Sequence, residues 1–210
     1  MTAAIVVGVL VVHNLLTNLW FTDRWAWAYV PVNLATAGGL VWVAGAEVPM
    51  GAWRPGLAAA MAVVAAVAVV AIARPRWVAD RRMAGVGASG TAYRALVRIP
   101  LGTVVLEEVA FRAVLPALLS PAGAAALFGL WHVAPAANAL EVNGRRRRGA
   151  PLVAAAVVVT GLVGLVLWEL RVATGGLAAP MLAHAAANSG ATVAAYAVLR
   201  GSCRRGRPRS

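Results

Sequence analysis

The sequence predicts an all-α fold, specifically a polytopic helical membrane protein with about seven transmembrane helices and eight possible. Of its 210 residues, 61% are hydrophobic and only 12% are charged, and the mean hydropathy is +0.78. A soluble domain carries about 25% charged residues, so this chain has too little charge to cover a surface that faces water. Long apolar runs recur without the alternation of a membrane β-strand, which favours helices over a barrel.

Seven apolar segments define these helices in chain order, and each has about the 17–25 residues that cross the hydrocarbon layer. They are 3–20, 26–46, 57–73, 99–119, 122–138, 152–170 and 177–199. The first lacks the basic region of a secretory signal peptide, so we expect it to be retained as a membrane helix. Helix breakers separate the segments, namely Pro49, the run 54–56, Pro75, Pro100, Pro121, Pro151 and the pair Gly175-Gly176.

The arginines test this order of helices independently. All nineteen basic residues are arginine, against seven acidic residues. If successive helices alternate in direction, sixteen arginines fall on one side of the membrane, while the other side receives only Arg54 and Arg171. Positively charged loops face the cytoplasm. We therefore predict an integral protein of the bacterial cytoplasmic membrane, with the N-terminus outside and the C-terminus cytoplasmic.

The same arginines could suggest a nucleic-acid partner, but no basic module interleaved with aromatic residues accompanies them. We interpret them as anchors that contact the lipid bilayer, and we predict no nucleic-acid binding. The single cysteine, Cys203, excludes an intrachain disulfide and a cysteine-based metal site. The sequence does not specify an oligomeric state.

Ionisable side chains within membrane helices are costly and mark functional sites by default. Three of the predicted spans carry a conspicuous polar group. These groups are Glu107, Glu108 and Arg112 in the fourth span, His132 in the fifth, and His184 and Asn188 in the seventh. The first span carries His13, Asn14 and Asn18, which we interpret as a polar stripe for helix packing.

The spacing of these residues assigns them faces. Glu108 and Arg112 are four residues apart, so they share a helix face and can form an ion pair. Glu107 lies about 100° around the helix from Glu108, which leaves it free for chemistry with a different neighbour. His184 and Asn188 share a face in the same way. Phe128 lies four residues before His132 and is expected to form an aromatic wall beside it.

Two carboxylates, two histidines and an amide in one membrane cavity point to hydrolysis. A glutamate can deprotonate water while a histidine positions it, and Asn188 can donate a hydrogen bond to an oxyanion. Glu107, His132 and His184 also form a ligand set found in catalytic zinc sites. Zinc is therefore a possible cofactor, and no organic cofactor is predicted. The alternative is that these groups only hold helices together.

Three motifs carry a family resemblance. They are Glu107-Glu108-x-x-x-Arg112, Phe128-x-x-x-His132 and His184-x-x-x-Asn188. In order and spacing they resemble the motifs of the CPBP intramembrane protease family, which includes CAAX prenyl endopeptidases and Abi-type bacteriocin-immunity proteins. The resemblance implies a multi-helix membrane protease whose site opens toward the cytoplasmic leaflet. It also implies an acid–base or metal-associated role for Glu107, and a supporting pair formed by Glu108 and Arg112. By the same resemblance, His132 and His184 hold the catalytic water or a metal, and Asn188 stabilises the oxyanion.

The resemblance covers about half of the chain. It divides the sequence into motif-free membrane helices with a basic loop (1–94), a CPBP-like protease core (95–199) and a basic tail (200–210). Many family members have glycine after the arginine of the first motif, where this chain has Ala113. Family members commonly have eight spans rather than seven. Family mechanisms with and without zinc both fit this sequence.

The predicted function is intramembrane endopeptidase activity on a peptide bond near the membrane. The all-arginine, Ala/Val-rich composition is typical of a bacterial protein, which favours a bacterial peptide or membrane-protein segment over a prenylated CAAX peptide as substrate. A proton-coupled transporter is the first alternative, because buried Glu and His also form proton relays. A non-catalytic membrane scaffold or immunity factor is the second.

Overall fold

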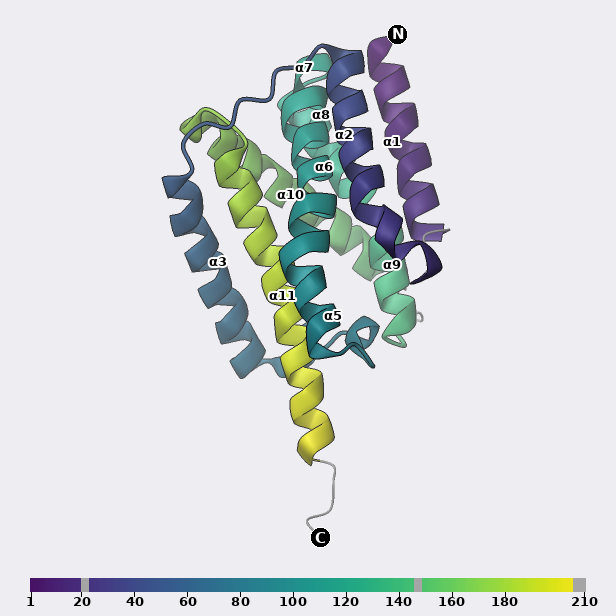
Figure 1. The fold of residues 1–210 in the computed structure, drawn as a ribbon, viewed down its shortest axis with the longest axis vertical. Coiled ribbons are helices and arrows are strands. Elements are labelled where there is room, and N and C mark those ends of the chain that lie inside the picture. The colour runs from purple at the N-terminus through teal and green to yellow at the C-terminus, as the bar shows by residue number, and fades with distance from the viewer. Residues whose placement is uncertain (20–22, 146–148, 206–210) are drawn as a thin grey trace.

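The computed structural model describes residues 1–19, 23–145 and 149–205, and the regular elements within these ranges are all helical. The predicted all-α fold is confirmed. The chain runs back and forth along the bundle, so that the N-terminus and the end of the last helix, α11, lie at opposite ends (Figure 1). The predictions for Trp20, for Arg146 to Arg148 and for the tail beyond Arg205 fall outside the described residues.

Most helices follow the predicted apolar segments. They are α1 (Thr2–Leu19), α2 (Tyr29–Ala44), α3 (Arg54–Ala73), α8 (Pro121–Trp131), α9 (Val133–Val142), α10 (Gly149–Thr174) and α11 (Ala178–Arg205). A 3-10 turn, η1 (Asp23–Ala28), leads into α2, while α4 (Pro75–Val78) and η2 (Arg81–Met83) follow α3. Within the described ranges, three helical stretches are long and apolar enough to cross a membrane, Ala26–Ala44, Arg54–Ala73 and Gly149–Thr174, and Thr2–Asn18 is a shorter apolar helix. The count of seven spans stays a prediction.

The fourth predicted segment belongs to a continuous helix. It consists of α5 (Ala88–Tyr93), η3 (Arg94–Val104), α6 (Val105–Glu108), η4 (Val109–Val114) and α7 (Leu115–Leu118), with π-helical geometry in η3 and η4. The predicted break at Pro100 is wrong, because this proline lies inside η3. A π-helical stretch gives the backbone another hydrogen-bond register, so a proline without an N–H need not end the helix.

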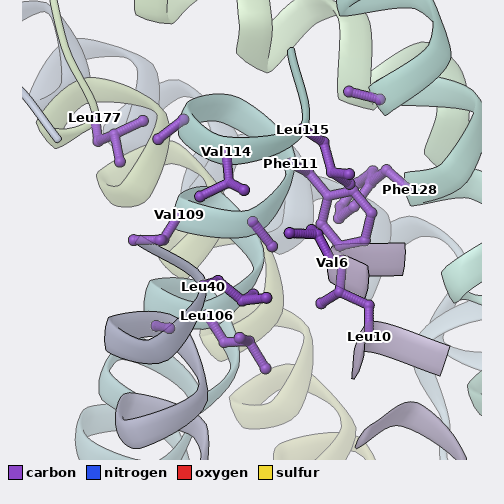
Figure 2. Packing of buried hydrophobic residues seen from close by; sticks show 14 residues of the cluster. Val6, Leu10, Leu40, Leu106, Val109, Phe111, Val114, Leu115, Phe128 and Leu177 are labelled. Atoms are coloured by element: carbon purple, nitrogen blue, oxygen red, sulfur yellow. The ribbon is translucent and has the colours of Figure 1, made fainter. Parts of the chain in front are cut away.

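This central helix forms the core of the bundle. Every residue from Leu106 to Leu115 is buried. Val6 and Leu10 from α1, Leu40 from α2 and Phe128 from α8 join it in one hydrophobic cluster (Figure 2). A helix that is buried on all sides lies at the centre of its bundle. The charged residues of the first motif are therefore enclosed by protein.

Two helices display apolar side chains on the outside. In Figure 1, α3 lies at the edge of the bundle beside α11. Ile72 on α3 is 83% exposed and Val166 on α10 is 66% exposed. Water would make such surfaces costly, whereas lipid tails are as apolar as the side chains themselves. The exposed faces agree with an integral membrane protein.

The connections at the two ends agree with helices that alternate in direction. At the end from which the C-terminal helix leaves, Arg81 N donates to Asn143 Oδ1 at 3.0 Å. At the other end, Ala52 N donates to Thr174 O at 2.8 Å, close in sequence to Arg54 and Arg171. The two arginines assigned to the minority side therefore lie at the same end of the bundle. The assignment of the arginine-rich end to the cytoplasm stays a prediction.

The fifth predicted segment is not one helix. It divides into α8 and α9 at His132, whose backbone has φ −86° and ψ 0°. Pro135 in the sequence predicts that the helix loosens just after His132, and the structure places the junction of the two helices at His132. Pro135 has no N–H to donate to the carbonyl four residues earlier, which belongs to Trp131.

Close helix packing predicts a strong effect at one glycine. A Cβ atom on Gly129 of α8 would lie 2.5 Å from the Val157 carbonyl oxygen of α10. We expect Gly129→Ala to lower the free energy of unfolding by about 1–3 kcal/mol, because it overpacks a helix contact made by backbone. Thermal unfolding in detergent measures the change.

Gly8→Ala on α1 is the matched control, because a Cβ atom on Gly8 would have no other atom within 4 Å. We expect Gly8→Ala to leave the unfolding temperature unchanged or to raise it slightly. Equal unfolding temperatures for the wild type and Gly129→Ala would contradict the close contact between α8 and α10.

Candidate functional site

Three elements bring the predicted site residues together. The central helix supplies Glu107, Glu108 and Arg112, and α11 supplies His184 and Asn188. His184 contacts both carboxylates, at 2.7 Å from Glu108 and 3.6 Å from Glu107. The remaining residue, His132, lies at the junction of α8 and α9 and lines the same cavity as Glu107 and Asn188.

Glu108 is fully buried, and its two carboxylate oxygens face two different side chains. Its Oε1 lies 2.7 Å from His184 Nδ1, and its Oε2 lies 3.5 Å from Arg112 Nε. The predicted ion pair with Arg112 is confirmed. A carboxylate without water is tolerated only when a cation and hydrogen bonds compensate for its lost hydration. Glu108 therefore ties the central helix to α11 through His184.

Arg112 lies against an aromatic ring as well as against the acid. Its guanidinium carbon is 4.0 Å from the centre of the Phe128 ring. The side chain is 1% exposed, and its three guanidinium nitrogens make no hydrogen bond with any of the described residues. The cation is thus held by the charge of Glu108 and by the face of Phe128.

The hydrogen bonds of His184 specify one tautomer. Ionised Glu108 can only accept, so His184 Nδ1 carries the proton that it donates to Oε1. The other ring nitrogen, Nε2, lies 3.1 Å from Asn188 Nδ2, which is placed to donate to it. In the neutral ring, Nε2 therefore presents a lone pair on the side of Glu107.

Glu107 has one oxygen bonded and one oxygen free of hydrogen bonds. Trp131 Nε1 donates to Oε1 at 3.0 Å. Oε2 is buried, has no hydrogen-bond partner among the described residues and lies 3.6 Å from His184 Nε2. Glu107 and Glu108 are predicted to have different neighbours. This is confirmed in part, because Trp131 bonds only to Glu107, whereas His184 faces both acids. A buried, unpartnered carboxylate oxygen beside a histidine suits the binding of a polar reactant.

The helix break orients His132. The backbone N–H of His132 bonds to Gly129 O at 3.0 Å, which leaves the Phe128 carbonyl to accept from His132 Nδ1 at 2.8 Å. This bond assigns the proton to Nδ1 and leaves Nε2 as an acceptor. The rings of Phe128 and His132 are 4.7 Å apart and meet edge to face. The predicted aromatic wall is confirmed.

A cavity connects this site to the arginine-rich end of the bundle. Its volume is about 720 Å³, and it is lined at its inner part by Glu107, His132 and Asn188. Arg82 and Arg98 are among the residues that line it nearer the end of the bundle. The buried Glu107 carboxylate and the arginines of that end therefore line one cavity.

Asp80 also lines this cavity, and it bonds to two other residues that line it, Arg82 and Asn143. Burial by itself would raise the pKa of the Asp80 carboxyl, but hydrogen bonds from Arg82 and Asn143 hold that pKa below its ordinary value. Arg82 is 2.6 Å from this carboxylate, and Asn143 Nδ2 donates to it at 3.1 Å. These bonds join the connection after α3 to the end of α9.

The predicted zinc ligands do not form a metal site in the described residues. No group of three or more His, Cys, Asp or Glu side chains there has the arrangement needed to hold a metal. Glu107 Oε2 and His184 Nε2 face one another, but His184 Nε2 is also within hydrogen-bond distance of Asn188. The side chains as placed do not fit a zinc ion held by all three residues, and zinc stays a prediction.

Sequence reasoning missed Trp131. A tryptophan in an apolar helix is usually a packing residue, and its bond to Glu107 depends on how two helices are rotated against each other. The predicted packing role is confirmed for two of the first-span polar residues, because His13 lies 3.3 Å from Asn33 of α2 and Asn14 donates to Trp131 O at 2.8 Å. The third, Asn18, bonds to Asn14 of its own helix. The clue in the sequence was Pro135, which leaves the Trp131 carbonyl without a helical donor.

The structure thus combines an all-helical fold that has long apolar helices with a buried polar site of carboxylates and histidines. Residues 89–190 match the family model described as "Type II CAAX prenyl endopeptidase Rce1-like". This match supports the resemblance to the CPBP intramembrane protease family, and with it protease activity on a peptide or protein substrate in a membrane. No curated protein and no solved structure shows significant similarity to the chain.

The buried ion pair predicts a sharp difference between single and double substitutions. We expect Arg112→Met to lower the free energy of unfolding by about 3–5 kcal/mol, because it leaves Glu108 buried without its arginine. Glu108→Gln combined with Arg112→Met should recover most of this loss. Unfolding in detergent measures all three proteins, and a double variant as unstable as Arg112→Met would contradict the pairing.

Proposed function

We propose that this protein is an intramembrane endopeptidase in which Glu107 is the general base. The supporting observation is the state of its carboxylate, with Oε1 bonded to Trp131 and Oε2 free of hydrogen bonds at the inner part of a cavity. A base must offer a lone pair to water within hydrogen-bond reach. Oε2 meets that requirement, whereas the oxygens of Glu108 face Arg112 and His184.

The proposed reaction is the hydrolysis of one peptide bond. Glu107 Oε2 takes a proton from a water molecule, whose oxygen attacks the peptide carbonyl carbon. His132 Nε2 accepts a hydrogen bond from the other proton of that water. The carbonyl oxygen becomes an oxyanion, and Asn188 Nδ2 donates to it. When the carbon–nitrogen bond breaks, Glu107 returns the proton to the leaving amine.

Glu108 and Arg112 are positioning residues in this scheme. Glu108 holds His184 through Nδ1, so the Nε2 edge of the ring faces Glu107 and Asn188. A histidine fixed by a carboxylate keeps one tautomer and one orientation. We propose that this arrangement keeps the reacting water between Glu107 and the α11 pair. Zinc is the alternative; Glu107, His132 and His184 would hold it only in another arrangement than the one described above, and it would then supply an activated water.

The cavity supports a substrate that approaches from the arginine-rich end. We propose that this end is cytoplasmic and that the substrate is a bacterial peptide or a membrane-protein segment. The arginines near the cavity favour anionic surroundings such as lipid headgroups. The chain would then act within the bacterial cytoplasmic membrane.

Removal of any of three side chains should abolish cleavage. We expect Glu107→Ala, His132→Ala and His184→Ala each to lower cleavage by about 100-fold or more, because each removes a group that handles the water. Purified protein in proteoliposomes would be incubated with a library of bacterial membrane peptides. Mass spectrometry would then count newly formed peptide ends.

Glu169→Gln is the matched control, because Glu169 is an exposed carboxylate on α10. Full cleavage by Glu107→Ala would overturn the proposed role of that residue. Solute uptake that depends on Glu107, without cleavage, would instead support the transporter.

Metal analysis tests the zinc alternative separately. If zinc is the cofactor, it should copurify with the wild type and be lost from His132→Ala and from His184→Ala, since each variant lacks a ligand. Active wild-type protein without zinc would support the glutamate mechanism. Zinc retained in both variants would contradict the predicted ligand set.

A further inference from the structure

The carbonyl of Trp131 is satisfied from another helix. Four residues later in the chain, Pro135 lacks the N–H that would bond to it in a regular helix. Asn14 of α1 supplies a donor instead, at 2.8 Å from Asn14 Nδ2 to Trp131 O. Asn14 Oδ1 in turn accepts from Asn18 Nδ2 at 2.7 Å. The amide of Asn14 is therefore held at both its oxygen and its nitrogen.

The indole of Trp131 is also held by rings. His13 is nearly parallel to it, with ring centres 6.2 Å apart and planes at 14°, and Phe111 meets it edge to face at 5.6 Å. Contacts of this geometry are favourable between aromatic rings. The indole is thus confined between α1 and the central helix.

His13 is itself fixed to α2 by both ring nitrogens. Nε2 lies 3.3 Å from Asn33 Oδ1, and Nδ1 lies 3.1 Å from Thr36 Oγ1. Asn33 is 2% exposed and donates to Tyr29 O at 2.6 Å. A buried chain of bonded side chains therefore runs from α2 through His13 to the face of the indole.

We propose that His13 and Asn14 of α1 position Trp131, and that Trp131 then positions the carboxylate of Glu107 for catalysis. This inference rests on the proposed function. The indole N–H can only donate, so it occupies Oε1 and restricts rotation of the carboxylate. Oε2 is then the oxygen presented to water. The helix that begins the chain thereby completes a site whose motif residues all lie within residues 89–190.

Two variants separate positioning from packing. Trp131→Phe keeps an aromatic ring and removes the N–H, while Asn14→Ala removes the donor to the Trp131 carbonyl. We expect kcat to fall by about 10-fold to 100-fold in Trp131→Phe, and by less in Asn14→Ala, with KM unchanged in both. A small displacement of a catalytic group has effects of this size.

The hydrogen bond itself can be followed without a substrate. The chain has eight tryptophans, so ¹⁵N-indole labelling of the full chain in detergent gives few NMR signals, and Trp131→Phe identifies one of them. We expect this signal to shift in Glu107→Ala and in Asn14→Ala. It should stay in place in Thr160→Ala, the matched control, whose hydroxyl bonds to carbonyls of its own helix.

Each outcome decides the matter. A Trp131 signal that does not move in Asn14→Ala overturns the link to α1. Unchanged kcat in Trp131→Phe, with active wild-type protein, overturns the positioning of Glu107. A rise in KM that accounts for the whole loss of activity overturns it as well, because it shows a packing effect on substrate binding. A wild-type protein that cleaves no peptide refutes the proposed function, while the NMR shifts still decide whether the network exists.

Discussion

The site depends on a compensated charge cluster at the centre of the bundle. Glu108 has no exposed surface, and Arg112 and His184 both face its carboxylate and compensate for the hydration that it loses. This requirement fixes the rotation of the central helix and the position of α11 together. Glu107, the next residue to Glu108, is then directed at the α8–α9 junction. One electrostatic constraint thus places the Glu107 carboxylate.

The break between α8 and α9 at His132 supplies the second requirement. Irregular backbone at membrane depth is tolerated only where protein or a water-filled cavity surrounds it. At His132 the freed carbonyls are taken by side chains, Phe128 O by His132 and Trp131 O by Asn14. These two backbone carbonyls therefore keep hydrogen-bond partners despite the break. His132, the residue at the break, lines the cavity.

The features that could be predicted from the sequence are those with a local origin. Hydropathy located the helices, and the four-residue spacing gave the pair of Glu108 and Arg112 and the contact of Phe128 with His132. The break expected at Pro100 does not occur because a π-helical register, which depends on surrounding packing, keeps that helix continuous. The bond of Trp131 to Glu107 could not be predicted either, since it joins two helices whose relative rotation no local pattern specifies.

Arginines at the end of the bundle and the buried Arg112 have different kinds of partners, because they differ in exposure. Near the end of the bundle, the Arg82 side chain is 46% exposed and pairs with the partly buried Asp80. Arg112 has neither water nor headgroups, so an acid and an aromatic face must replace them. Arg112 is expensive to bury, and the Glu108 carboxylate compensates for its charge. The charge of Glu108 in turn keeps His184 in the tautomer that presents a lone pair toward Glu107.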